Sequence, residues 1–243
     1  MRIPVMRGLI DRRILANYRV DPIVLARVVP PPFRPKLIHG HGLAGICLIR
    51  LKHVRPRFLP RAVGLASENA AHRIAVEWDQ DGQVREGVYI PRRDTSSRLN
   101  ALVGGRLFPG EHHHARFDVS ESDDRFQIAL ESDDDHTRVA IDARVSPALP
   151  AGSVFTSFDE ASAFFRRGSV GYSVTSKPGT FDGLELDSFE WKMEPLAVDR
   201  VASSFFDDRA TFPAESLTFD CALLMRGIEH AWHGRASLCA ACP

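Results

Sequence analysis

Lysine is scarce in this chain of 243 residues. Only four of its 31 basic side chains are lysine, and the other 27 are arginine. The basic side chains are balanced by 31 acidic ones, so the formal net charge is zero. A protein that binds nucleic acid by electrostatics would carry a basic stripe and a positive net charge. We therefore expect no nucleic-acid partner.

Long apolar runs are also missing. None approaches the ~20 residues that a membrane-spanning helix needs, and the apolar stretch within residues 1–11 is too short for a secretory signal. The four cysteines are too few for a disulfide scaffold in a chain of this length. With 44% hydrophobic residues, the chain is too apolar for intrinsic disorder. These features favour a folded, reduced protein of the cytoplasm without a membrane partner.

None of the familiar catalytic motifs occurs in the sequence. It has no GxSxG nucleophile turn, no P-loop, no HExxH pair and no GxGxxG after a predicted strand. No segment has the composition of a linker, and no internal repeat is visible. We therefore predict one domain over residues 1–243, in which residues 231–243 form a loosely attached tail.

The sequence does contain many apolar, β-branched and alternating runs that are typical of strands. Helices are predicted only where a capping residue precedes a short apolar segment, which occurs after Asp21, Ser97 and Ser157. So many strands in one domain favour a closed or nearly closed antiparallel β barrel with two or three short helices. The predicted strands cover residues 12–20, 42–53, 66–78, 83–90, 112–119, 125–130, 137–145, 183–186, 189–201 and 216–230.

The first candidate site is a pair of arginines, Arg92 and Arg93, that follows a predicted strand and precedes a predicted helix. Two guanidinium groups beside the N-terminal end of a helix favour an anion such as a carboxylate or phosphate. The alternative is that each arginine pairs with an acid nearby in the sequence, for example Arg93 with Asp94 or Glu86.

The second candidate is Glu68, which lies in a segment of small and apolar residues. His72 follows it by four positions, so both side chains project from the same face of a strand, roughly 13 Å apart. Both could then face one cavity. In such surroundings the pKa of Glu68 would be raised, and the group could act as a general acid or base. The alternative is an exposed strand carboxylate.

Two groups of residues have the ligand types of a metal site. In the run from His112 to His114, the first and third side chains share one face, but no third ligand has a recognisable spacing. Near the C-terminus, the spacing between the two pairs of side chains is far shorter than in a zinc finger. That second group consists of His230, His233, Cys239 and Cys242. We expect no resident metal and no cofactor, with a zinc site at the C-terminal group as the alternative.

Three segments of the chain carry a family resemblance: YRVDP at 18–22 followed by Leu25, Val29 and Pro30, SEN at 67–69, and GVYIPRR at 87–93. With these segments the chain resembles an uncharacterised bacterial family related to acetoacetate decarboxylase. The resemblance extends over about residues 13–230, and its most specific part is VYIPRRDTSS. It implies the acetoacetate-decarboxylase-like fold, which is a closed antiparallel β barrel or cone with an internal ligand cavity.

Acetoacetate decarboxylase forms a Schiff base through a lysine that follows a proline and precedes a second lysine. The matching stretch here is Pro91-Arg92-Arg93, so both lysines are replaced by arginine. Arginine stays protonated and cannot act as an amine nucleophile. Among the remaining lysines, Lys192 is the least implausible substitute for the Schiff-base lysine, and it lies outside the matching motif. The resemblance also implies that Glu68 corresponds to a glutamate of the family's pocket.

We therefore expect a protein that binds a small carboxylate or keto acid in its cavity. Arg92 and Arg93 would hold the carboxylate, while Glu68 and Tyr89 would line the cavity. One alternative is a lyase or decarboxylase-like enzyme in which Glu68 acts as the acid or base on an arginine-bound substrate. A second alternative is a metal-dependent enzyme. The decarboxylase relatives form multimers, which makes a homo-oligomer an expectation here.

Overall fold

A computed structural model describes residues 4–104 and 109–240. Within these residues, 13 strands form one sheet. The elements are β1 (Met6–Val20), α1 (Pro22–Val28), β2 (Arg34–Pro35), β3 (Leu37–Ile38), β4 (His41–Pro56), η1 (Arg61–Val63), β5 (Leu65–Gln80), β6 (Gln83–Thr95), α2 (Arg98–Val103), β7 (His113–Glu121), β8 (Arg125–Ser132), β9 (Arg138–Val145), α3 (Phe158–Arg167), β10 (Val170–Val174), β11 (Thr180–Ser188), β12 (Glu194–Ser203) and β13 (Leu217–Cys239).

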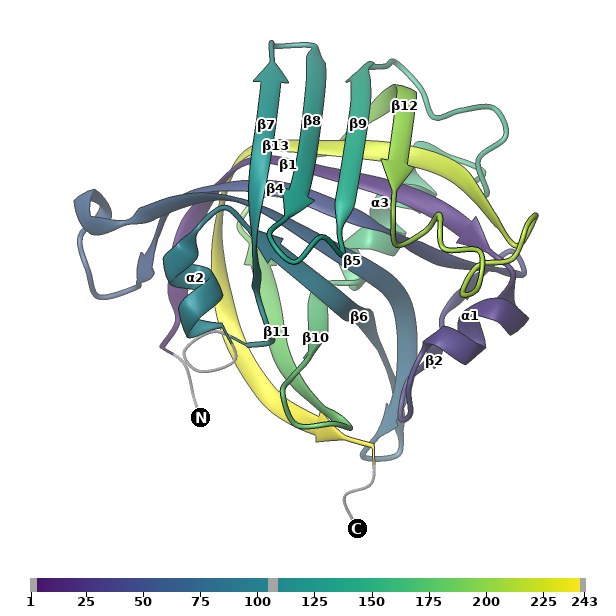
Figure 1. Ribbon diagram of the computed structural model, residues 1–243, viewed down its shortest axis with the longest axis horizontal. Coiled ribbons are helices and arrows are strands. Elements are labelled where there is room, and N and C mark those ends of the chain that lie inside the picture. Colours follow the sequence, from purple (N-terminus) through teal and green to yellow (C-terminus); the bar gives the residue numbers. More distant parts are fainter. Residues whose placement is uncertain (1–3, 105–108, 241–243) are drawn as a thin grey trace.

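The sheet closes on itself more than once (Figure 1). Its order is β11-β10-β6-β7-β8-β9-β12-β13-β1-β4-β5-β2, and further pairings join β11 to β13 and β5 to β6. One ring of seven strands therefore contains β13, β1, β4, β5, β6, β10 and β11. The predicted mainly β class with short helices is confirmed. The strands are not all antiparallel, however, because β6 pairs in parallel with both β10 and β7.

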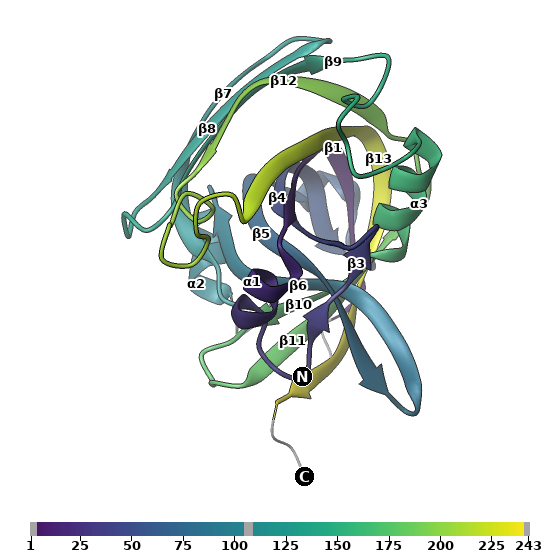
Figure 2. The same cartoon turned by 90° about the vertical axis from the view of Figure 1, so that its right-hand side faces the viewer.

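The long strands β1, β4 and β5 are covered on both faces. On one face, Ile14, Ile46 and Ile74 are fully buried in a cluster that includes Ile128 and Ile141 of the β7–β9 side. Figure 2 shows β7, β8, β9 and β12 as a curved layer over these strands. The opposite face looks into the seven-strand ring. Because side chains alternate along a strand, each position is assigned to either the core or the ring interior.

The three predicted α-helices form where their caps predicted them. The Asp21 carboxylate accepts from two backbone N–H groups at the start of α1, and the Ser97 hydroxyl accepts from one at the start of α2. Ser157 does the same for α3. The apolar face of α3 is buried through Phe164 and Phe165 in a second core cluster beside β13 and β1. Among the described helices, none is long and apolar enough to cross a membrane.

The C-terminal segment differs from the prediction of a loose tail over 231–243. Residues up to Cys239 continue β13, which is paired with β1 as far as Trp232 and with β11 as far as Cys239. That prediction is therefore wrong for residues 231–239, because residues 231 and 232 are paired with both β1 and β11 and the rest of the segment runs along β11. Residues 241–243 lie outside the described part. The short strand β10 was not predicted, and β12 begins at Glu194 rather than at residue 189.

Candidate functional site

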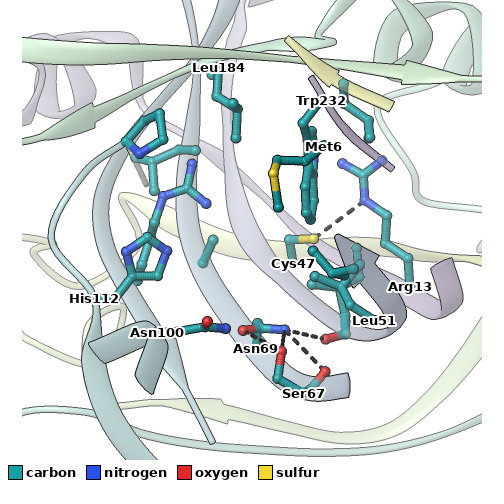
Figure 3. Close-up of a pocket in the computed structure, with 18 of the residues that line it drawn as sticks. Met6, Arg13, Cys47, Leu51, Ser67, Asn69, Asn100, His112, Leu184 and Trp232 are labelled. Atoms are coloured by element: carbon teal, nitrogen blue, oxygen red, sulfur yellow. Dashed lines mark hydrogen bonds between the residues drawn. The ribbon is translucent and has the colours of Figure 1, made fainter. Parts of the chain in front are cut away.

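A cavity of about 510 Å³ lies inside the seven-strand ring. Every strand of the ring contributes to its wall, and most of the lining side chains are apolar. Figure 3 shows Met6, Leu184 and Trp232 on one side of this space, and Arg13 and His112 across from each other. A mainly apolar space with a few converging polar groups is the usual form of a small-molecule site.

An arginine pair on β1 is divided between the two faces of the sheet. Arg12 faces away from the cavity, where its guanidinium is ion-paired with the carboxylate of Glu68. Arg13 faces the cavity, and its described hydrogen bonds go only to sulfur atoms. Its Nε donates to Cys47 Sγ at 3.4 Å, and its Nη1 donates to Met225 Sδ at 3.8 Å. The outer arginine is thus neutralised and the inner one is not.

The second arginine pair, on β6, is divided in the same way by a β-bulge. Two residues of β6, Ile90 and Pro91, lie opposite a single residue of β5, Arg73. Such a bulge shifts the alternation of the strand by one position, and a proline is tolerated there. As a result Ile90 and Arg93 both line the cavity. Arg92 takes the opposite face.

Arg92 is not part of the cavity lining, and two carboxylates hold its guanidinium. Its guanidinium lies 2.8 Å from Asp94 Oδ1 and 2.8 Å from Asp134 Oδ2. Hydrogen bonds from Arg92 hold the pKa of Asp134 well below its usual range. The alternative of pairing with a nearby acid therefore holds for Arg92, and the predicted position of Arg92 on the cavity wall is wrong. Arg93 is on the wall as predicted.

Four arginines line the cavity. Arg55, near the end of β4, donates to the backbone carbonyl oxygens of His53 and Leu59, and the other three are Arg13, Arg73 and Arg93. Arg73 donates to the side-chain oxygen of Asn17, and its guanidinium lies 5.0 Å from the centre of the Phe165 ring. Arg93 Nε donates to Ser173 Oγ at 2.8 Å. Burial lowers the pKa of both Arg73 and Arg93 to about 10.

No ion pair with a carboxylate is found for Arg13, Arg73 or Arg93 within residues 4–104 and 109–240, whereas Arg12, Arg50 and Arg92 each have one. Burying a charge without an opposite charge is costly. The cavity therefore holds positive charge that no carboxylate pairs with, since Asp94, which also lines it, is paired with Arg92. Arg13 and Arg73 were missed in the sequence, although Arg73 and its neighbour His72 are the only polar residues in the apolar run Ala70–Val76.

His112 also lines the cavity, with its ring close to the segment that carries Arg93. Its Nδ1 lies 3.1 Å from the carbonyl oxygen of Gly110. Because a carbonyl oxygen can only accept, we assign the proton to Nδ1, which leaves Nε2 as an acceptor. Burial, with a further contribution from Arg93, lowers the pKa of His112 to about 3. The ring is therefore neutral at pH 7.

Glu68 does not reach the cavity. It shares a strand face with His72 as predicted, but this is the face opposite the cavity. The Glu68 carboxylate is paired with both Arg12 and Arg50, and Glu121 completes the cluster. His72 is fully buried, and its Nε2 lies 3.0 Å from Ser203 Oγ. The predicted position of Glu68 on the cavity wall is therefore wrong, as is the alternative of an exposed carboxylate.

Tyr89 is also outside the cavity. Its neighbours Val88 and Ile90 line the wall, so Tyr89 points to the other face. There its ring centre lies 5.8 Å from that of Phe33 and 5.8 Å from that of Phe181. Tyr89 is thus part of an aromatic core cluster, and its predicted place in the lining is wrong.

The structure does not assemble the histidine run into a metal site. His113 lies 3.2 Å from Asp134, and His114 lies 2.7 Å from Asp133, whereas His112 faces the cavity. Across the described residues, no group of three or more His, Cys, Asp or Glu side chains is placed to hold a metal ion.

The C-terminal group is spread along β13. His230 is fully buried, with its ring centre 4.5 Å from that of Trp232. His233 and Cys239 are six residues apart on the strand, which corresponds to roughly 20 Å. Such a spacing cannot bring both side chains to one tetrahedral zinc ion. Cys242 lies outside the described residues.

Solved structures that share this fold include acetoacetate decarboxylase and an acetoacetate decarboxylase-like enzyme. One is acetoacetate decarboxylase from Legionella pneumophila (TM-score 0.60, 11% identity, 96% of this chain and 87% of that chain). Another is the enduracididine biosynthesis enzyme MppR in complex with pyruvate (TM-score 0.63, 11% identity, 99% and 91%). A third is an acetoacetate decarboxylase-like enzyme from Sphingomonas wittichii (TM-score 0.54, 10% identity, 97% and 92%). At these identities the likeness defines the fold alone.

The sequence places the chain within that class more narrowly. It belongs to the DUF2071 family, described as an uncharacterized conserved protein, whose model matches residues 10–222. No curated protein sequence matches the chain. The predicted membership in an uncharacterised family related to acetoacetate decarboxylase is therefore confirmed.

Proposed function

We propose that the cavity binds an organic carboxylate, held by Arg93 together with Arg73 and Arg13. The observation that carries this proposal is the contrast between paired and unpaired arginines. Each outward arginine of the two pairs has a carboxylate partner, and each inward one has none among the described residues. A bound carboxylate supplies the missing opposite charge, and the planar guanidinium fork matches its two oxygens.

The fold neighbours are consistent with this ligand class. One of them, MppR, is described in complex with pyruvate, which is a small keto carboxylate. The wall formed by the described residues contains arginines but no lysine. Lys36 lies outside this wall and is ion-paired with Glu86. The proposal therefore concerns binding by fixed charges and includes no amine nucleophile.

The lyase alternative depended on Glu68 acting on a substrate held by the arginines. Since Glu68 and Arg93 face opposite sides of the sheet, the Glu68 carboxylate cannot touch a ligand in the cavity. We therefore do not carry that alternative further. One acceptor atom in the cavity lining is Nε2 of neutral His112.

The test compares hexanoate with 1-hexanol by isothermal titration calorimetry, because the two probes differ mainly in the charged group. Hexanoate is expected to bind, and Arg93→Met is expected to weaken it by about 10- to 100-fold, as for the loss of a charge-assisted hydrogen bond. Binding of 1-hexanol should not change. Arg116→Met, at an exposed arginine outside the cavity, is the matched control and should have no effect.

Arg73→Met gives a second test of the same kind. Both variants remove an unpaired buried charge, so neither is expected to lower stability by much. Equal affinities for hexanoate and 1-hexanol, or an unchanged hexanoate affinity in both variants, would overturn the proposal.

A further inference from the structure

The cavity is much larger than a small keto acid requires. Its volume of about 510 Å³ corresponds to about 17 water-sized groups at ~30 Å³ each. Cavities of this size usually enclose ligands with many more non-hydrogen atoms than pyruvate or acetoacetate. If a short acid were held at the arginines, most of the apolar wall would remain without a partner.

Buried positive charge is concentrated at one end of the wall, whereas Arg55, near the other end, donates to the backbone carbonyl oxygens of His53 and Leu59. Arg73 pairs with Gly45 and Ala71 with Cys47, and further along the same two strands Ser67 pairs with Leu51. From Cys47 to Leu51 the strand advances roughly 13 Å away from Arg73. Ser67 and Asn69, which lie in between, hydrogen-bond to each other and to the backbone, so their polar groups are already satisfied (Figure 3).

Exposure increases in the same direction. Arg73, at the deep end, is 7% exposed, whereas Leu65, at the start of β5, is 50% exposed. Leu59 and Val63 precede it in the β4–β5 connection, and all three apolar side chains line the cavity while remaining open to solvent. Large apolar side chains that are exposed together mark interaction sites more often than chance. We call residues 59, 63 and 65 the apolar mouth.

We propose that the ligand is an amphipathic monocarboxylate with an extended apolar body of about seven carbons or more. Its carboxylate lies at Arg73 and Arg93, and its apolar body runs past Leu51 toward the apolar mouth. This inference rests on the proposed function, since it assumes that the arginines hold the carboxylate. It adds the size and chemistry of the remainder of the ligand.

The main test is a chain-length series of butanoate, octanoate and dodecanoate, each paired with its 1-alkanol and measured by calorimetry below the micelle concentration. Each methylene that becomes buried should lower Kd about fourfold, so octanoate should bind at least tenfold more tightly than butanoate. A Kd that stays flat along the acid series would overturn the inference and leave carboxylate binding intact. Alcohols that bind as tightly as the acids would instead overturn the proposed function.

A pair of variants locates the apolar body. Leu65→Gln changes the apolar mouth without adding charge, and Leu37→Gln is the control at a residue of similar exposure, 49%, outside the cavity lining. Leu65→Gln should weaken dodecanoate at least threefold and leave butanoate unchanged, whereas Leu37→Gln should affect neither. Because both positions are half-exposed, both variants should fold. Unchanged dodecanoate affinity in Leu65→Gln, or equal losses in the two variants, would contradict the inference.

Discussion

The Glu68→Gln substitution separates a structural role of this carboxylate from a role in the cavity. Glu68 is 13% exposed and lies between Arg12, which is 2% exposed, and Arg50. The substitution keeps the size of the side chain and removes its negative charge. Arg12 then loses its close partner while remaining buried, and an unpaired buried charge destabilises the folded state.

The size of the effect follows from the geometry. Removing one partner of a buried ion pair costs about 3–5 kcal/mol. The loss should be smaller here, because Glu121 still compensates part of the charge: it lies 3.6 Å from Arg12 and is also paired with Arg50. We therefore expect a loss of about 2–3 kcal/mol in the free energy of unfolding, and a melting temperature lower by roughly 4–12 °C for a chain of this size.

Urea denaturation followed by circular dichroism measures this loss. Glu131→Gln is the matched control, because Glu131 lies 2.9 Å from Arg138 in an exposed ion pair, where about 0.5 kcal/mol or less is expected. Hexanoate affinity should be unchanged in both variants. If Glu68→Gln were as stable as Glu131→Gln but no longer bound hexanoate, the assignment of Glu68 to the face opposite the cavity would be refuted.

Two further predictions concern buried groups. Burial lowers the pKa of His72 to about 3, below the unfolded value of 6.5, so its contribution to stability is complete above pH 6.5 and is lost as the pH falls. His72→Gln should therefore reduce the slope of unfolding free energy against pH by up to about 1.4 kcal/mol per pH unit between pH 4 and 6, and an unchanged slope would argue against a neutral His72. Cys47 lines the cavity, so octanoate should slow its alkylation by iodoacetamide, measured by peptide mass spectrometry, but not that of Cys239 on β13. Equal protection of both thiols would show that octanoate binds elsewhere.

Local patterns were sufficient for most elements of the fold. The helices begin where Asp21, Ser97 and Ser157 cap them, because the capping hydrogen bond is made within one turn of the chain. The long strands were recognised from their apolar and alternating residues for the same reason. The end of β13 was missed because residues 231–239 are mixed in polarity. What fixes them is pairing with β1 and β11, which are distant in the sequence.

The candidate site was harder to predict because it depends on which face of a strand each side chain takes. The position of Arg93 on the cavity wall requires the bulge at Ile90 and Pro91, which a strictly alternating pattern does not reveal. Glu68 and His72 do project from the same face of β5, as predicted. The sequence alone could not show which face of β5 encloses the cavity. That choice is made by the closure of the ring through β11 and β13.

The neutral net charge conceals a separation of charge across the sheet. Arg12 and Arg92 point away from the cavity and are paired with carboxylates. Arg13 and Arg93, their neighbours in sequence, face the cavity and have no carboxylate partner among the described residues. Burial depresses the pKa of any cationic group, and a lysine at such a position would readily become neutral. Arg93, whose pKa is lowered only to about 10, remains charged at pH 7. Arginine at this position therefore gives a permanent anion-binding charge where a lysine would give an amine that can lose its proton.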